Sequence, residues 1–246
     1  MHTYRVLILF FFIGIGACTT NPTYYPEKAS TPLFNQAKQL SGSINQHAFN
    51  RGYSADMAYA INKRHFISGK YSLSQQQNCT SCITNIRDYR ELALGKYGSI
   101  NDNYRYAFLF GFGQASSSSH EDPNLFSSNS SLANASFKRS FLQYNISTGE
   151  KYFGRWLEVT RVFIIRGSYV KNNFYQITDI NTNTHIYPSG KDWSTFLEPA
   201  GSVKFLLFKT IGVEFQAGFS IALISEKRFN HDFLWFTSGV QYHFSP

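Results

Sequence analysis

Aromatic residues at every second position constrain the fold of this chain more than any other feature. Side chains alternate between the two faces of a β-strand, so one face of residues 103–113 is wholly aromatic and the other is small or polar. The aromatic positions are Tyr104, Tyr106, Phe108, Phe110 and Phe112. A soluble strand buries such a face under a second layer, whereas a membrane-barrel strand turns it to lipid.

The same period of two recurs in ten segments, most of them close to the length of a tilted strand that crosses a membrane. The segments are 39–47, 53–61, 66–73, 88–97, 103–113, 137–146, 156–168, 196–208, 211–222 and 234–244. We therefore predict an all-β fold, an antiparallel up-and-down transmembrane β-barrel of about ten strands, within a range of eight to twelve, that occupies residues 38–246.

The connections between these segments alternate in length, except that the first, Ala48–Gly52, is also short. The long ones cover residues 74–87, 114–136, 169–195 and 223–233. Membrane barrels have short periplasmic turns and long outer loops, and a periplasmic N-terminus puts all four long connections outside. Residues 169–195 could also continue two strands beyond the membrane. This sorting of loops indicates a bacterial outer-membrane location, with membrane lipid as the first partner.

The N-terminal residues, Met1–Ala17, are typical of an export signal, because a dozen apolar residues follow Arg5 and are too few to span a bilayer. The signal ends in Ile15-Gly16-Ala17-Cys18, which resembles a bacterial lipobox. This predicts a covalent lipid on Cys18 and no other cofactor. An ordinary cleaved signal, with Cys18 incidental, is the alternative.

Residues 18–37 contain Pro22, Pro26 and Pro32 and show no periodicity, which is typical of an extended tether. We expect this tether to join a lipid on the periplasmic side to the barrel.

Turning the apolar face outward places a set of polar residues on the lumen face. They are Asp56, Lys70, Glu91, Arg105, Gln143, Glu158, Glu198, Lys204, Glu214, Gln216 and His243. Isolated buried charges are costly, so we expect these side chains to pair across a narrow, largely filled lumen. The phase is least certain at 156–166, where Val162 and Ile164 also fall inward unless a bulge shifts the register.

Few residues suggest chemistry. The histidines of the mature chain have many serines near them in the predicted barrel, yet no nucleophile motif appears, so we predict no enzyme. A lipid hydrolase or acyltransferase stays as the alternative.

Cys79 and Cys82 form a loop disulfide in one interpretation and are free thiols in the other. No spacing predicts a metal site. The net charge of +8 is scattered, which argues against nucleic-acid binding.

The C-terminal run from Phe236 to Phe244 resembles the terminal signal of outer-membrane barrels, except that Ser245 and Pro246 follow it. The chain as a whole resembles a family of small lipobox-bearing outer-membrane β-barrel proteins of the Bacteroidetes type. The segments that carry the resemblance are Thr31-Pro32-Leu33-Phe34, Tyr59-Ala60-Ile61-Asn62, Glu91-Leu92-Ala93-Leu94-Gly95, Phe110-Gly111-Phe112-Gly113, Phe141-Leu142-Gln143-Tyr144-Asn145, Phe196-Leu197-Glu198-Pro199-Ala200 and Val240-Gln241-Tyr242-His243-Phe244. The resemblance implies location and architecture, and no activity.

Three functions fit the sequence. The first is a non-enzymatic barrel lipoprotein that is structural or binds a partner, such as another envelope protein, through its outer loops. The second is a narrow channel or an accessory subunit of an outer-membrane transport complex. The third is a tethered lipocalin-like barrel that binds an apolar ligand. The oligomeric state is left open.

Overall fold

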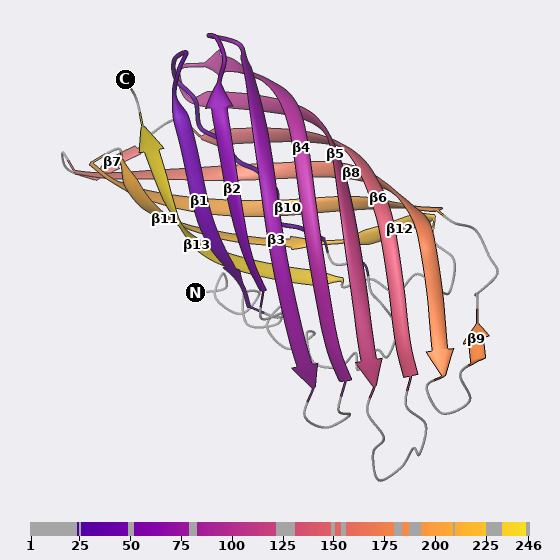
Figure 1. Cartoon of the computed structure of the whole chain (residues 1–246). Helices are drawn as coiled ribbons and strands as arrows, with labels where there is room; N and C mark the ends of the chain where they lie inside the picture. The colour runs from indigo at the N-terminus through magenta and orange to yellow at the C-terminus, as the bar shows by residue number, and fades with distance from the viewer. Residues whose placement is uncertain are drawn as a thin grey trace, which may run out of the picture.

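A closed antiparallel barrel of ten strands forms the body of the protein, as the alternating segments predict (Figure 1). The computed structural model describes residues 24, 26–48, 52–78, 83–121, 131–148, 151–153, 156–179, 184–186, 193–208, 210–224 and 233–244. The strands are β1 (Leu40–His47), β2 (Gly52–Ala60), β3 (His65–Asn78), β4 (Ile83–Asn101), β5 (Tyr104–Glu121), β6 (Ser131–Thr148), β7 (Lys151–Phe153), β8 (Leu157–Asp179), β9 (Thr184–Ile186), β10 (Trp193–Leu207), β11 (Ile211–Phe219), β12 (Ile221–Ile224) and β13 (Leu234–Phe244). Within these described ranges, no helix has the length and apolar character needed to span a membrane.

The wall runs in the order β1, β2, β3, β4, β5, β6, β8, β10, β11 and β13, and the last strand pairs with the first. The seam between β1 and β13 is in register from Leu40, which pairs with Phe244, to His47, which pairs with Thr237. The short strands β7, β9 and β12 extend this wall at its ends. Pairing the terminal strands removes both edges, so every wall strand has two neighbours.

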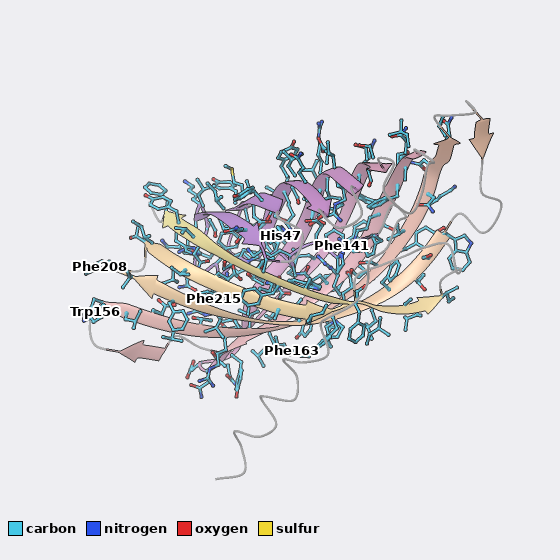
Figure 2. All side chains as sticks on the ribbon, turned by 90° about the horizontal axis from the view of Figure 1, so that it is seen from below. His47, Phe141, Trp156, Phe163, Phe208 and Phe215 are labelled. Atoms are coloured by element: carbon cyan, nitrogen blue, oxygen red, sulfur yellow. The ribbon has the colours of Figure 1, made fainter. Side chains whose placement is uncertain are left out.

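Large apolar side chains cover the outer surface of the wall. Phe163 and Phe215 point outward and are 53% and 42% exposed, whereas His47 and Phe141 point into the barrel (Figure 2). A strand that faces lipid needs this arrangement, because no aqueous solvent contacts it there. A lipocalin-like barrel has the opposite one, with an apolar interior and a polar surface.

Several strands are longer than the sequence predicts. Much of the expected loops 74–87, 114–136 and 169–195 is strand, since β4 and β5 stay paired as far as Ile83 and Glu121. The sequence prediction stopped where apolar alternation ends, as at the serines of residues 116–119. Beyond the membrane a strand does not need that alternation, because hydrogen bonds to its neighbours are enough to continue it. The continuation of β8 to Asp179, where it pairs with β9, matches the extension foreseen for 169–195.

The two ends of the barrel differ. At one end the described strands are joined by short connections, such as residues 61–64 between β2 and β3 and residues 102–103 between β4 and β5. We call this the turn end and the opposite one the loop end. At the loop end the rim is uneven, because β8 has 23 residues whereas β1 has 8 and β2 has 9 (Figure 1).

The register at residues 156–166 shows no bulge. The pairing of β8 with β10 is continuous from Leu157 to Lys171, and Val162 and Ile164 are both buried in the interior. They pack in one cluster with Ala29, Ala200 and Trp235. Val162 and Ile164 therefore do point inward, as the unshifted register predicts. They pack against the segment before β1.

Glycines on the lumen face make room for aromatic side chains, and Gly111 gives a test of this packing. A Cβ at Gly111 would overlap the Phe141 ring and lie 2.8 Å from the Cβ of Ala93, whereas one at Gly201 meets nothing within 4 Å. We expect Gly111→Ala to lower the free energy of unfolding by about 1–3 kcal/mol, the usual cost of overpacking. The measurement is denaturant unfolding in lipid vesicles, with Gly201→Ala as the control; equal stability of both variants would contradict this packing.

Candidate functional site

The segment that precedes β1 lies inside the barrel (Figure 1). We call Tyr24 and residues 26–36 the lumen segment. It has almost no regular secondary structure, and Tyr24, Glu27, Lys28 and Ala29 are at most 2% exposed. It is extended, as the prolines predict, but it fills the lumen instead of acting as a tether outside the wall. Lys38, with a φ of 64°, turns the chain from the lumen into β1.

The lumen segment touches every strand of the wall. Polar contacts reach nine strands, through Ser43 (β1), Asp56 (β2), Lys70 (β3), Arg87 (β4), Arg105 (β5), Gln143 (β6), Arg166 (β8), Glu198 and Lys204 (β10) and Glu214 and Gln216 (β11). Trp235 of β13 packs in the same apolar cluster as Ala29. The wall and the segment are therefore one packed unit, since each strand contributes to holding the segment.

Many of these hydrogen bonds join wall side chains to backbone groups of the lumen segment. Lys70 donates to the carbonyl oxygen of Lys28, Lys204 donates to that of Thr31, and Gln143 Nε2 donates to that of Ser30 at 2.6 Å. Ala29 N–H in turn donates to Gln216 Oε1 at 2.7 Å. An extended chain without a strand partner needs such acceptors and donors, because buried backbone groups without hydrogen bonds are costly.

Lys28 is the centre of one charged cluster. Its Nζ lies 2.9 Å from Glu214 Oε2 and 3.2 Å from Asp56 Oδ2. Lys70 lies 3.4 Å from Asp56 Oδ1, and Lys204 lies 3.8 Å from Glu214 Oε1. The lysine of the segment thus sits between two wall carboxylates, each of which also faces a wall lysine.

Glu198 is the centre of a second cluster. Its Oε2 lies 2.7 Å from Arg139 Nη2 and 2.7 Å from Arg166 Nε, and Oε1 accepts the Tyr24 hydroxyl at 2.8 Å. Ser168 Oγ also donates to Oε2, at 2.7 Å. One buried carboxylate therefore forms ion pairs with two guanidinium groups and binds the start of the lumen segment.

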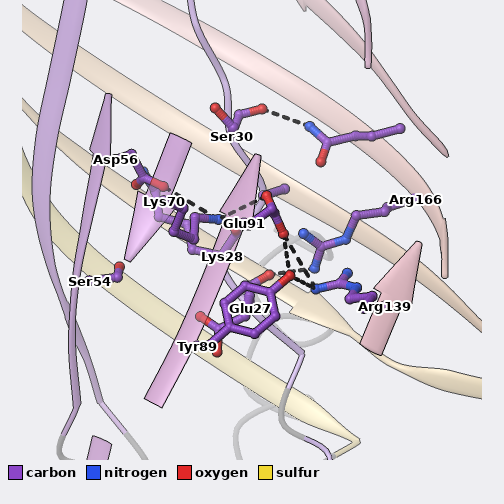
Figure 3. A network of polar contacts seen from close by, with 12 residues as sticks. Glu27, Lys28, Ser30, Ser54, Asp56, Lys70, Tyr89, Glu91, Arg139 and Arg166 are labelled. Carbon is purple, nitrogen blue, oxygen red and sulfur yellow. Dashed lines mark hydrogen bonds and ion pairs between the residues drawn. The ribbon is translucent and has the colours of Figure 1, made fainter. Parts of the chain in front are cut away.

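A line of wall residues connects the two clusters. Glu91 lies 3.9 Å from Lys70 Nζ and 3.9 Å from Arg139 Nη1, and it accepts a hydrogen bond from the Tyr89 hydroxyl (Figure 3). The buried ionic side chains of the described ranges comprise six cations and five anions, and the half-buried Asp56 adds a sixth anion. The buried ones are Lys28, Lys70, Arg87, Arg139, Arg166 and Lys204 against Glu27, Glu91, Glu158, Glu198 and Glu214. Pairing of this kind is what makes so many buried charges tolerable.

Two small cavities adjoin the lumen segment in the part of the chain that the structure describes. A cavity of about 20 Å³ lies beside Lys28, Asp56 and Glu214, and one of about 10 Å³ lies beside Phe34 and Tyr97. A water molecule needs roughly 10–15 Å³ on this measure, so each cavity holds about one. Neither is large enough for a solute.

The structure places all eleven sequence-predicted polar residues on the inner face of the wall. Eight contact the lumen segment directly: Asp56, Lys70, Arg105, Gln143, Glu198, Lys204, Glu214 and Gln216. Glu91 joins the two clusters, Glu158 accepts from Thr160 at 3.4 Å, and His243 lies 3.4 Å from Gln241 Oε1. They pair mainly through the lumen segment and less often directly across the lumen.

Sequence reasoning missed the other half of both clusters. Arg139 lies on the same face as Gln143, four residues away, and that parity could have identified it. Arg87 fell in a predicted loop, and Glu27 and Lys28 fell in the predicted tether. Cys18, Cys79 and Cys82 lie outside the described residues, so the lipid and the disulfide stay predictions.

One histidine of the described wall lies close to a serine. His47 Nε2 is 3.2 Å from Ser54 Oγ, and both side chains are buried. Neither residue lines either of these two cavities. Within the described ranges, no three His, Cys, Asp or Glu side chains are placed to bind a metal ion.

Comparison with known proteins supports the architecture. The barrel is similar to the translocator domain of the autotransporter NalP from Neisseria meningitidis, with 11% identity, a TM-score of 0.52 and coverage of 83% of this chain and 87% of that one. It also matches, with TM-scores of 0.38 and 0.41, the KdgM porin (10% identity, 84% of this chain and 99% of that one) and LpxR from Salmonella typhimurium (7% identity, 83% and 99%). No protein-family model and no curated protein matches the sequence. The chain therefore has the fold of outer-membrane β-barrels, closed by ten antiparallel strands.

Proposed function

We propose that this protein is a non-conducting, lipid-anchored outer-membrane barrel that binds a partner through the outer ends of its strands. One observation carries the proposal: its own N-terminal segment fills the lumen and is bonded to the whole wall. A conduction path needs a continuous space, and cavities of about 20 and 10 Å³ do not make one. The surface outside the lumen is then what the protein offers to other molecules.

The outer parts of β5, β6 and β8 are the proposed binding surface. Their outward face is apolar at Phe112, Leu142 and Tyr169 and becomes polar further toward the loop end. The polar outward residues include Gln114, Ser116, Lys138, Lys171 and Asn173. This change supports an extension of the wall beyond the hydrocarbon layer, where it meets water and other envelope components.

The remaining parts of the proposal rest on the sequence. The run Ile15-Gly16-Ala17-Cys18 supports a lipid on Cys18. The seven segments named above support membership of the lipobox-bearing Bacteroidetes-type family. The lack of a nucleophile motif in the sequence supports a non-enzymatic role.

Site-specific photo-crosslinking in intact cells tests the binding surface. A photoreactive amino acid at Ser116, which is exposed on the outward face of β5, should give a discrete adduct of defined mass. The matched control is the same amino acid at Lys63, which is exposed in the connection between β2 and β3 at the turn end. We expect no such adduct there. No adduct at Ser116, or the same adduct at both positions, would contradict the proposal.

A further inference from the structure

The two ends of the lumen segment are held by aromatic clusters at opposite ends of the barrel. The Phe34 ring lies 5.5 Å from that of Phe66 and 5.4 Å from that of Tyr97. The Tyr24 ring is stacked on Phe196 at 4.6 Å and lies 5.8 Å from Phe137. Phe66 is the second residue of β3 and follows a turn-end connection, whereas Phe196 is the fourth residue of β10 and follows a loop-end connection. The segment therefore connects the turn end to the loop end.

The direction of the segment is fixed by its order of contacts along two strands. β11 starts at the turn end, and the Thr31 hydroxyl donates to Glu214 while Ala29 N–H donates to Gln216. β10 starts at the loop end, and Tyr24 bonds to its Glu198 while Thr31 bonds to its Lys204. In both comparisons, lower residue numbers of the segment lie nearer the loop end.

Between these clusters the segment passes the whole apolar band of the wall. Phe66 and Tyr97 at the turn end have the polar neighbours His65 and Lys96 on the outward face. At the loop end, Tyr24 shares its cluster with Tyr89, Phe137 and Val170. Their outward neighbours include Arg90, Lys138 and Lys171, all exposed. On β4, β6 and β8, Tyr24 thus lies near the level where the outer surface turns polar, whereas on the β10 side the outward residues Ile221 and Leu223 are still apolar and exposed.

The length of the segment agrees with a full crossing. Ten residues separate Tyr24 from Phe34, and an extended chain covers at most about 33–36 Å over that number. The apolar band of an outer-membrane barrel is about 25 Å tall. The segment is long enough to cross it once, and it has no helix or hairpin that would shorten its reach.

We infer that the chain leaves the barrel at its loop end, so that residues before Tyr24, including Cys18, lie on the outer side of the membrane. The inference replaces the periplasmic position expected from the sequence, because that expectation treated residues 18–37 as a tether at the turn end. A lipid on Cys18 then belongs to the outer leaflet. The position of the lipid depends on the proposed lipidation, whereas the direction of the chain does not.

Where the strands end early at the loop end, the chain before Tyr24 is long enough to bring Cys18 to the outer leaflet. Six residues lead from Cys18 to Tyr24, with a reach of about 20 Å. Phe196, which stacks on Tyr24, is only three residues from Trp193, the first residue of β10. On the high side, β8 continues nine residues from Val170 to Asp179. A lipid can therefore reach the membrane over β10 and over β11 and β13, the two strands that follow it in the wall.

Labelling of a single thiol in intact cells tests the inference. The variant Asn21→Cys, made with Cys79→Ser and Cys82→Ser, is treated with a membrane-impermeant biotin maleimide, and the signal is divided by that of denatured protein. Asn173→Cys on the exposed outer part of β8 and Lys63→Cys at the turn end are the two controls. We expect Asn21→Cys to label like Asn173→Cys and several-fold more than Lys63→Cys. Labelling only after the outer membrane is permeabilised, or only after denaturation, would overturn the inference.

The parent variant, which retains Cys18 alone, separates this inference from the proposed lipid. An acylated and processed Cys18 has no thiol, so we expect only background labelling of the parent. Strong labelling of the parent in intact cells would refute the lipid and would still place the N-terminus outside. A turn-end position of residue 21 would leave the closed lumen and the crosslinking surface untouched, and these have their own tests.

Discussion

Removal of residues 24–36 is expected to convert the closed barrel into a conducting one. In planar bilayers the intact protein should give no resolved current steps, and the deletion variant should give discrete steps. The reason is that this segment occupies the lumen along its length, with Glu27, Lys28 and Thr31 among its buried side chains. Without it, water reaches Asp56, Glu214 and the other wall charges, and a ten-strand barrel is wide enough to hold that water once the segment is gone.

Two controls make this experiment specific. Deletion of residues 19–22 shortens the chain by a part that makes none of the described contacts, and we expect that variant to stay closed. A synthetic peptide of residues 22–38, added to the deletion variant, should reduce the current, because it restores the same partners to the wall. A heat-dependent shift in gel mobility verifies that each variant is folded. Conduction by the intact protein, or a folded deletion variant that stays closed, would contradict the role of the segment.

Glu198→Gln is expected to destabilise the barrel by about 3–5 kcal/mol, the usual cost of leaving a buried charge without its partner. Glu198 is the one carboxylate within 2.7 Å of both Arg139 and Arg166, and each of these arginines is at most 1% exposed. The Gln variant keeps the shape but leaves two cations close together. Unfolding in lipid vesicles, followed by tryptophan fluorescence, measures the loss.

The matched control removes a charge from an exposed pair. Asp88 lies 3.3 Å from Arg90, whose side chain is 74% exposed, so Asp88→Asn should change stability by less than about 1 kcal/mol. Combining Glu198→Gln with Arg139→Met should recover part of the loss, because a buried pair replaced as a whole by apolar groups is often tolerated. If Glu198→Gln were as mild as Asp88→Asn, the second cluster would not hold the lumen together.

The wall could be predicted because its determinants are local. Alternation in residues such as Phe108, Phe110 and Phe112 fixes both the strand and the side that faces lipid, and ten such segments predicted the observed number of strands. The outer ends of the strands could not be predicted in the same way. Residues 116–119 are all serine, so no apolar and polar faces alternate there. They are strand only because they pair with residues distant in sequence, as Ser116 does with Asp88 and Ser136.

The lumen segment was foreseen only in part. The inward position of Asp56, Glu198 and Glu214 follows from alternation, so half of each charged cluster could be deduced. Their partners in the lumen segment could not be deduced, because the wall binds the segment largely through main-chain atoms such as the carbonyl oxygens of Lys28 and Thr31, which every residue type has. A proline-rich stretch without periodicity gives no sign of whether it lies in solvent or within a barrel.

The seam between β1 and β13 sets an order of events for biogenesis. It joins the two ends of the wall, and the segment before β1 runs along the lumen, where the two cavities among the described residues each hold about one water molecule. The proposed lipid on Cys18 would be far too bulky to be drawn through afterwards. The segment must therefore be in place while the wall is still an open sheet. The pairing of Leu40–His47 with the last strand then encloses it. The finished barrel thus encloses its own lumen segment, and release of the segment requires the β1–β13 seam to open.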